Sequence, residues 1–65
     1  MRVIYADVRA LDYCLPGVRQ WFKENGLNFN VFMKEGIELS ELEHLTDPMA
    51  IRVLEQAKKR ALANG

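Results

Sequence analysis

Apolar side chains recur at intervals of three and four residues along most of the chain, a spacing typical of helices that bury one face. Val18, Trp21 and Phe22 form one such stripe. Phe29 and Phe32 begin another, which Met33 completes. Together with the glycines, prolines and capping residues between the stripes, the pattern predicts helices over residues 7–12, 16–25, 29–35, 40–45 and 48–63.

Residues with special backbone preferences mark the ends of these segments. Pro16 suits the first turn of a helix, because the N–H that proline lacks has no partner there. Gly26 and Gly36 supply the left-handed conformation in which helices commonly end. Asn28 and Asp47 are expected to cap the helices that follow them by accepting hydrogen bonds from backbone N–H groups. These positions therefore set the boundaries of the three longest helices.

The remaining segments have weaker signals. Asp7 is expected to cap the first short helix, and Ser40 with Glu43 has the S-x-x-E pattern of a capping box. Residues 2–5 are rich in residues that favour strands, but no second run is evident for them to pair with. We therefore expect them to form a short extended N-terminal arm that packs on the core or pairs with a copy of itself.

These elements predict a single all-α domain over residues 1–65, a compact bundle of four to five short helices. Its core is expected to form around the aromatic side chains of the two central helices. The inner stripe of the last helix is expected to include Val53, Leu54 and Ala57 and to be widened by Ile51 and Leu62. A chain of 65 residues buries only about 60% of its unfolded surface, which leaves the fold marginally stable. Self-association is one common way in which such small domains are stabilised.

Composition excludes several classes of protein. With 49% hydrophobic and 28% charged residues, the chain is neither disordered nor collagen-like. No apolar run approaches the roughly 18 residues of a membrane span, and no signal peptide is evident, so we expect no membrane partner. The single cysteine excludes an intrachain disulfide and favours a reducing compartment, here the cytoplasm.

Candidate catalytic chemistry is sparse. A catalytic cysteine needs a base such as histidine, and Cys14 and His44 are the only candidates for this pair. They lie on separate predicted elements, and no third group is evident to orient the histidine. Their number and spacing do not suit a metal site, and each glycine lies at a helix boundary rather than in a phosphate-binding loop. We therefore expect a protein that is not an enzyme and has no cofactor.

The net charge of zero conceals a segregated distribution. Residues 1–34 carry a net charge of +2, residues 35–47 carry −5, and residues 48–65 carry +3. Exposed charges of this kind commonly form ordinary solvated faces. They also suit an interaction module, which is the function we expect, with another protein or a second copy of the chain as the partner. The residues predicted to bind it are Arg9, Tyr13, Arg19, Lys23, Glu38 and Glu41.

The alternative function is a helix-turn-helix DNA-binding regulator. Helices 16–25 and 29–35 flank a tight glycine turn, as in that motif. The second helix, however, offers only Asn30 and Lys34 to base edges, and it ends in Glu35. DNA-binding proteins usually neutralise several phosphates with lysine and arginine, so a helical hairpin that builds the core explains the same pattern.

The chain resembles a group of short proteins encoded by tailed bacteriophages and prophages. The residues that carry the resemblance lie within about 8–57 and are Val8-Arg9-Ala10-Leu11, Tyr13-Cys14, Gly17, Arg19, Trp21-Phe22, Gly26-Leu27, Phe32, Gly36-Ile37, Asp47 and Met49-Ala50. Many members of the group have Asp or Trp near positions 28–29, where this chain has Asn28-Phe29. The resemblance implies synthesis in a bacterial cytoplasm and a role in virion assembly, transcriptional control or inhibition of a host protein. It supplies no catalytic or ligand-binding residues.

Overall fold

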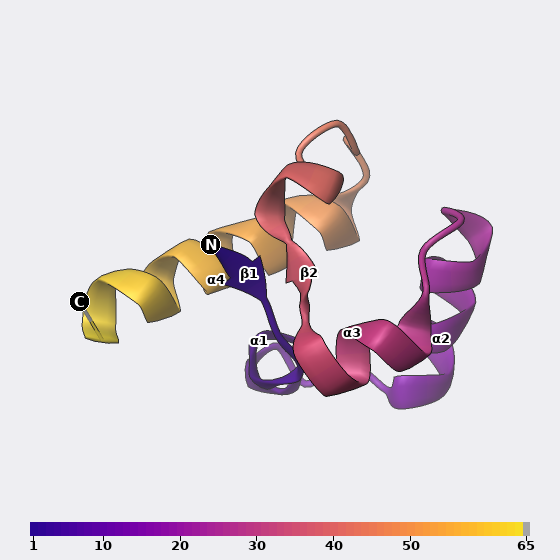
Figure 1. Cartoon of the computed structure of the whole chain (residues 1–65), viewed down its shortest axis with the longest axis horizontal. Coiled ribbons are helices and arrows are strands. Elements are labelled where there is room, and N and C mark those ends of the chain that lie inside the picture. Colours follow the sequence, from indigo (N-terminus) through magenta and orange to yellow (C-terminus); the bar gives the residue numbers. More distant parts are fainter. Residues whose placement is uncertain (65) are drawn as a thin grey trace.

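The computed structural model describes the backbone of residues 1–64 and the side chains of residues 1–63. Figure 1 shows α4 extending along one side of the molecule and the α2–α3 pair at the opposite end, with the two strands between them. This part of the chain is mostly helical, as the periodicity predicts. The elements in chain order are β1 (Arg2–Val3), α1 (Tyr5–Ala10), α2 (Leu15–Glu24), α3 (Phe29–Glu35), β2 (Ile37–Glu38), the 3-10 helix η1 (Leu39–Glu41) and α4 (Pro48–Asn64).

A two-stranded antiparallel sheet corrects the all-α prediction. β1 pairs with β2 in a register that places Arg2 opposite Glu38 and Val3 opposite Ile37. The N-terminal segment is therefore not an unpaired arm, because its partner lies within the same chain. Each strand has only two residues, which is too short to give the alternating pattern by which a strand is recognised in a sequence.

Gly36 allows the two strands to approach each other. Its φ of 77° lies in the left-handed region, and a Cβ atom placed on it would lie 2.6 Å from the carbonyl oxygen of Val3. No larger residue fits this position without moving β1, so one glycine both ends α3 and begins the pairing with the N-terminal strand.

The predicted helix boundaries are confirmed to within a residue or two for the longer helices, and Asn28 and Asp47 are caps. The side-chain oxygen of Asn28 accepts a hydrogen bond from the Val31 amide at 3.0 Å, and a carboxylate oxygen of Asp47 accepts one from the Ala50 amide at 3.2 Å. Asp7, however, is the third residue of α1 rather than its cap.

The predicted short helix after Ser40 is also wrong. Its place is taken by a single 3-10 turn that begins at Leu39. A carboxylate oxygen of Glu41 accepts a hydrogen bond from the Glu38 amide at 3.3 Å. A capping interaction therefore forms, but between Glu38 and Glu41, two residues earlier than the predicted pair Ser40 and Glu43.

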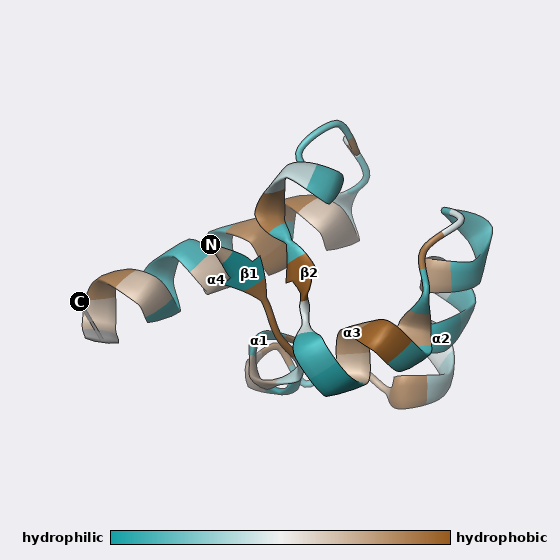
Figure 2. Ribbon diagram, viewed as in Figure 1, coloured by the Kyte–Doolittle hydropathy of each residue, from teal (hydrophilic) through white to brown (hydrophobic). Residues whose placement is uncertain are grey.

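The core lies where α4, the sheet and the α2–α3 pair meet. Figure 2 shows hydrophobic residues at this centre, where the chain leaves β1 and along β2, and hydrophilic positions over much of α2. Trp21 and Phe29 are half-buried and pack against the core rather than within it. The buried residues of the cluster are Val3, Val8, Val18, Phe22, Phe32, Ile37, Leu42, Val53 and Ala57.

The C-terminal half of α4 corrects the predicted core stripe. Val53 and Ala57 are buried, but Ile51 is 45% exposed and Leu62 is 83% exposed. α4 packs on α1 and β1, and Leu62 lies two residues beyond Arg60, whose side chain bonds to both of these elements. The stripe of buried residues is therefore narrower and shorter than the periodicity indicates.

Candidate interaction surface

A shallow hollow lined by two cations lies where α2 meets the start of α3. Arg19 and Lys23 are one helical turn apart on the exposed side of α2, so both reach the same patch of surface. The guanidinium carbon of Arg19 lies 5.3 Å from the centroid of the Phe29 ring, close enough for a cation–π contact. We call this the basic hollow, and its lining residues are Arg19, Lys23, Leu27, Asn28, Phe29 and Asn30.

The turn between α2 and α3 fixes the floor of the basic hollow. The Leu27 amide donates a hydrogen bond to the Phe22 carbonyl oxygen at 2.8 Å, which folds the chain back after Gly26. The side chain of Asn28 is held in turn by its capping bond to α3. These contacts hold the half-buried Leu27 between the two helices.

A second hollow lies on the other side of the same turn, and its charged lining residues are Arg2, Glu35, Glu38 and Glu41. We call it the acidic hollow; Leu27 and Asn28 also line it, so the two hollows are adjacent. Its further lining residues are Arg2, Gly26, Val31, Glu35, Gly36, Ile37, Glu38 and Glu41.

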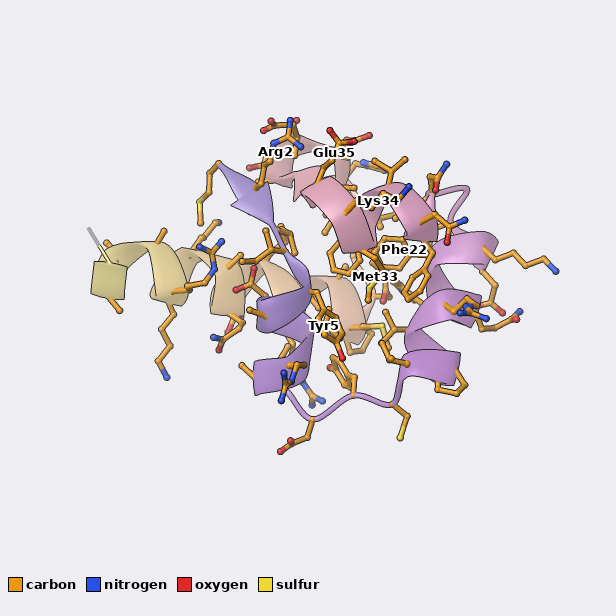
Figure 3. All side chains as sticks on the ribbon, turned by 60° about the horizontal axis from the view of Figure 1, so that its bottom comes forward. Arg2, Tyr5, Phe22, Met33, Lys34 and Glu35 are labelled. Carbon is orange, nitrogen blue, oxygen red and sulfur yellow. The ribbon has the colours of Figure 1, made fainter. Side chains whose placement is uncertain are left out.

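Pairing within the chain neutralises part of the acidic hollow. Glu38 lies 3.4 Å from Arg2 Nε through one carboxylate oxygen and 3.7 Å from the Met1 ammonium through the other. Arg2 also donates from Nη1 to the carbonyl oxygen of Glu35 at 3.1 Å, and Figure 3 shows these two residues side by side at one edge of the molecule. Glu38 is therefore engaged by the N-terminal strand.

The charged residues that line the two hollows and form no ion pair fall into two groups of opposite sign. Within the described part of the chain, Arg19 and Lys23 form no ion pair, and neither do Glu35 and Glu41. All four side chains are exposed. The basic hollow thus has two cations without an ion pair, and the acidic hollow has two such carboxylates.

Helix α3 contributes apolar side chains to the same region. Phe32 is its only buried residue, whereas Val31 is 40% exposed and Met33 is 39% exposed. Met33 was expected on the inner stripe, so its exposure is a correction. In a helix of seven residues, the inward side has room for little more than one large side chain in each turn, and the neighbours of Phe32 are left at the surface.

The predicted site residues do not all gather on one surface. Arg19 and Lys23 line the basic hollow, and Glu38 and Glu41 line the acidic one. Arg9 is exposed in the last turn of α1 and lines neither hollow. Tyr13 is half-buried against the core and also lines neither. Val31 lines the acidic hollow but was not among the residues predicted from the sequence, because its exposure depends on which side of α3 faces the core.

Residues with catalytic or ligand chemistry are dispersed. Cys14 is exposed directly before α2, and His44 is exposed in the turns after η1. Among residues 1–64, no group of three or more histidine, cysteine or acidic side chains is placed to hold a metal ion. Within that same range, no helix has the length and apolar character needed to cross a membrane.

Comparisons with other proteins add no relative: no protein-family model, curated protein or solved structure matches this chain.

Proposed function

We propose that this chain is a small, non-enzymatic protein–protein interaction module, phage-encoded and self-associating, that acts in virion assembly or by binding and inhibiting a host protein. The observation that carries the proposal is the exposure of Val31, which lines the acidic hollow on α3 next to the basic hollow. Met33, on the same helix, is exposed as well but lines neither hollow. Scattered single apolar residues are normal on protein surfaces. Here, however, one short helix exposes two of them, and charged residues surround Val31.

The composition of this region supports the proposal. Protein interfaces are enriched in aromatic residues, methionine and arginine, and they combine an apolar centre with a polar rim. Phe29, Met33 and Arg19 are residues of these kinds, and they lie on the adjoining helices α2 and α3. Arg19 is already ordered by its contact with the Phe29 ring, so less side-chain entropy would be lost when it binds a partner.

DNA binding is the second candidate, and the arrangement of α2 and α3 favours it. The two helices contact each other across a turn of four residues, and Arg19, Lys23 and Lys34 are exposed on them. The same helices end near Glu24 and Glu35, whose carboxylates would face the phosphates. This balance of charge supports a protein partner more strongly than a nucleic acid.

Capture of partners from a bacterial host lysate tests the proposal. The tagged protein is incubated with lysate, with and without nuclease, and the bound proteins are identified by mass spectrometry. We expect at least one stoichiometric protein that remains bound after nuclease treatment. Tagged Phe32→Ala, which removes a fully buried side chain, is the strongly destabilised control that identifies nonspecific capture. Loss of all captured protein on nuclease treatment would support DNA binding instead, and the absence of any specific protein would refute the module.

A further inference from the structure

We infer that the basic and acidic hollows together form a self-complementary surface through which two copies of this chain associate about a two-fold axis. The inference rests on the proposed function, because it names a second copy as a partner for the same surface. Three observations carry it: the position of the hollows on either side of one turn, their opposite unpaired charges, and the apolar side chains of Leu27, which lines both hollows, and Val31, which lines the acidic one.

The position of the hollows suits two-fold symmetry. Leu27 and Asn28 line both hollows, so the basic side chains lie to one side of this turn and the acidic side chains to the other. In a two-fold dimer the same patch on both copies meets itself, and each end faces the opposite end of the partner. An axis through the turn therefore brings each basic hollow opposite an acidic one.

The charges are complementary in number as well as in sign. Arg19 and Lys23 of one copy would face Glu35 and Glu41 of the other, and the symmetry repeats the contact. None of these four residues has an ion pair within the described part of its own chain, so association breaks no existing pair. The chain has no net charge, which removes the overall repulsion between two identical copies.

The centre of the surface is apolar. Val31, which lines the acidic hollow, is 40% exposed, and the half-buried Leu27 lies beside it. Exposed ion pairs contribute little by themselves, so burial of these side chains supplies affinity while the charges set the orientation. An apolar centre with charged ends is the usual arrangement of a protein interface.

Charge exchange between two variants tests the inference. Arg19→Glu/Lys23→Glu makes both ends of the surface acidic, and Glu35→Lys/Glu41→Lys makes both ends basic. Masses are measured by light scattering over a range of protein concentrations, and circular dichroism checks folding. We expect the wild type to reach twice its 7.5 kDa mass, each variant alone to stay monomeric, and an equimolar mixture of the two to dimerise again.

A matched control separates the proposed contact from general charge attraction. Arg52→Glu/Lys59→Glu makes the same change of net charge on α4, away from both hollows. We expect it to dimerise as the wild type does and to form no mixed dimer with Glu35→Lys/Glu41→Lys. If a double variant fails to fold, the single changes Lys23→Glu and Glu35→Lys provide the same exchange, because neither side chain forms a hydrogen bond or ion pair within the described residues.

Three results would overturn the inference. They are a wild type that stays monomeric at all concentrations, a dimer that neither reversal affects, and a mixture that fails to restore the dimer. Dimerisation should also weaken as salt is raised to about 1 M, where charges are screened within about 3 Å. A monomeric protein that still captures a host protein would overturn the dimer and the self-association, but would leave the proposed binding of a host protein standing, so the two failures are distinguishable.

Discussion

Arg60 donates a hydrogen bond from Nε to the carboxylate of Asp7 at 2.7 Å, and this contact joins the last helix to the first. The Asp7 side chain is fully buried, and its second oxygen accepts a hydrogen bond from the Ile4 amide at 2.9 Å. Arg60 also donates from Nη2 to the carbonyl oxygen of Arg2 at 2.9 Å. One guanidinium group thus connects α4 to both α1 and β1.

Removal of Arg60 should destabilise the fold strongly, because it leaves a buried carboxylate without its counter-ion. We expect Arg60→Met to lower the free energy of unfolding by about 3–5 kcal/mol, measured by urea denaturation. The double variant Asp7→Ala/Arg60→Met should be more stable than Arg60→Met alone, since it no longer buries a charge. Arg9→Met, at an exposed arginine of α1, is the control and should change stability by no more than about 0.5 kcal/mol. Equal effects at the two arginines would contradict this role.

A side chain at position 36 should disrupt the sheet. We expect Gly36→Ala to cost more than about 2 kcal/mol, because the left-handed backbone disfavours alanine and its Cβ would collide with the Val3 carbonyl oxygen. Gly17→Ala is the matched control: Gly17 lies within α2 with open space around it, and alanine there should stabilise by up to about 1 kcal/mol. Thermal melts of the two variants should therefore shift in opposite directions.

Asp47 links α2 to the start of α4. Its Oδ2 accepts a hydrogen bond from the indole Nε1 of Trp21 at 2.9 Å as well as from the Ala50 amide. We expect Asp47→Ala to cost about 1–2 kcal/mol through loss of the cap and to change the emission of the single tryptophan. The variant Trp21→Phe removes the donor but leaves the cap. A double-mutant cycle with no coupling between these positions would show that the indole contact contributes nothing.

Phe32 and Met33 are neighbours on α3 with opposite environments. Phe32 is 1% exposed and its ring centroid lies 4.7 Å from that of Phe22. Phe32→Ala should cost about 3–5 kcal/mol, a large part of the 5–15 kcal/mol that is typical of whole domains. Met33→Ala should cost less than about 1 kcal/mol and should instead weaken partner binding. Similar losses of stability at both positions, measured by denaturant melts, would contradict the orientation of α3.

The helical part of the fold was predictable because its signals are local. Proline at a first turn, asparagine or aspartate at a cap and glycine after a last turn act within four residues of the chain, and Asn28 and Asp47 behave as expected. The sheet was not predictable, since it joins Val3 to Ile37, and all of α1, α2 and α3 lie between these residues in the sequence. Asp7 bonds locally to the Ile4 amide as the third residue of α1, but its pairing with Arg60, 53 residues away, could not be predicted either.

The candidate surface was predictable only in part. The helical spacing of Arg19 and Lys23 places them on one face, and the structure confirms that they line one hollow. Glu38 was expected to be available to a partner, but strand pairing brings Arg2 against it. The exposure of Val31 depends on which side of α3 the core covers, and seven residues are too few for periodicity to decide that.

The central claim is that the surface formed by α2 and α3 binds a protein, and a comparison of three tagged proteins tests it most directly. Wild type, Arg19→Glu/Lys23→Glu and the control Arg52→Glu/Lys59→Glu are used for capture from nuclease-treated host lysate, and the bound partner is quantified by mass spectrometry. We predict that the control captures as much partner as the wild type and that the α2 variant captures at least about tenfold less, a loss of about 1.4 kcal/mol in binding free energy. Equal capture by all three folded proteins would contradict the claim.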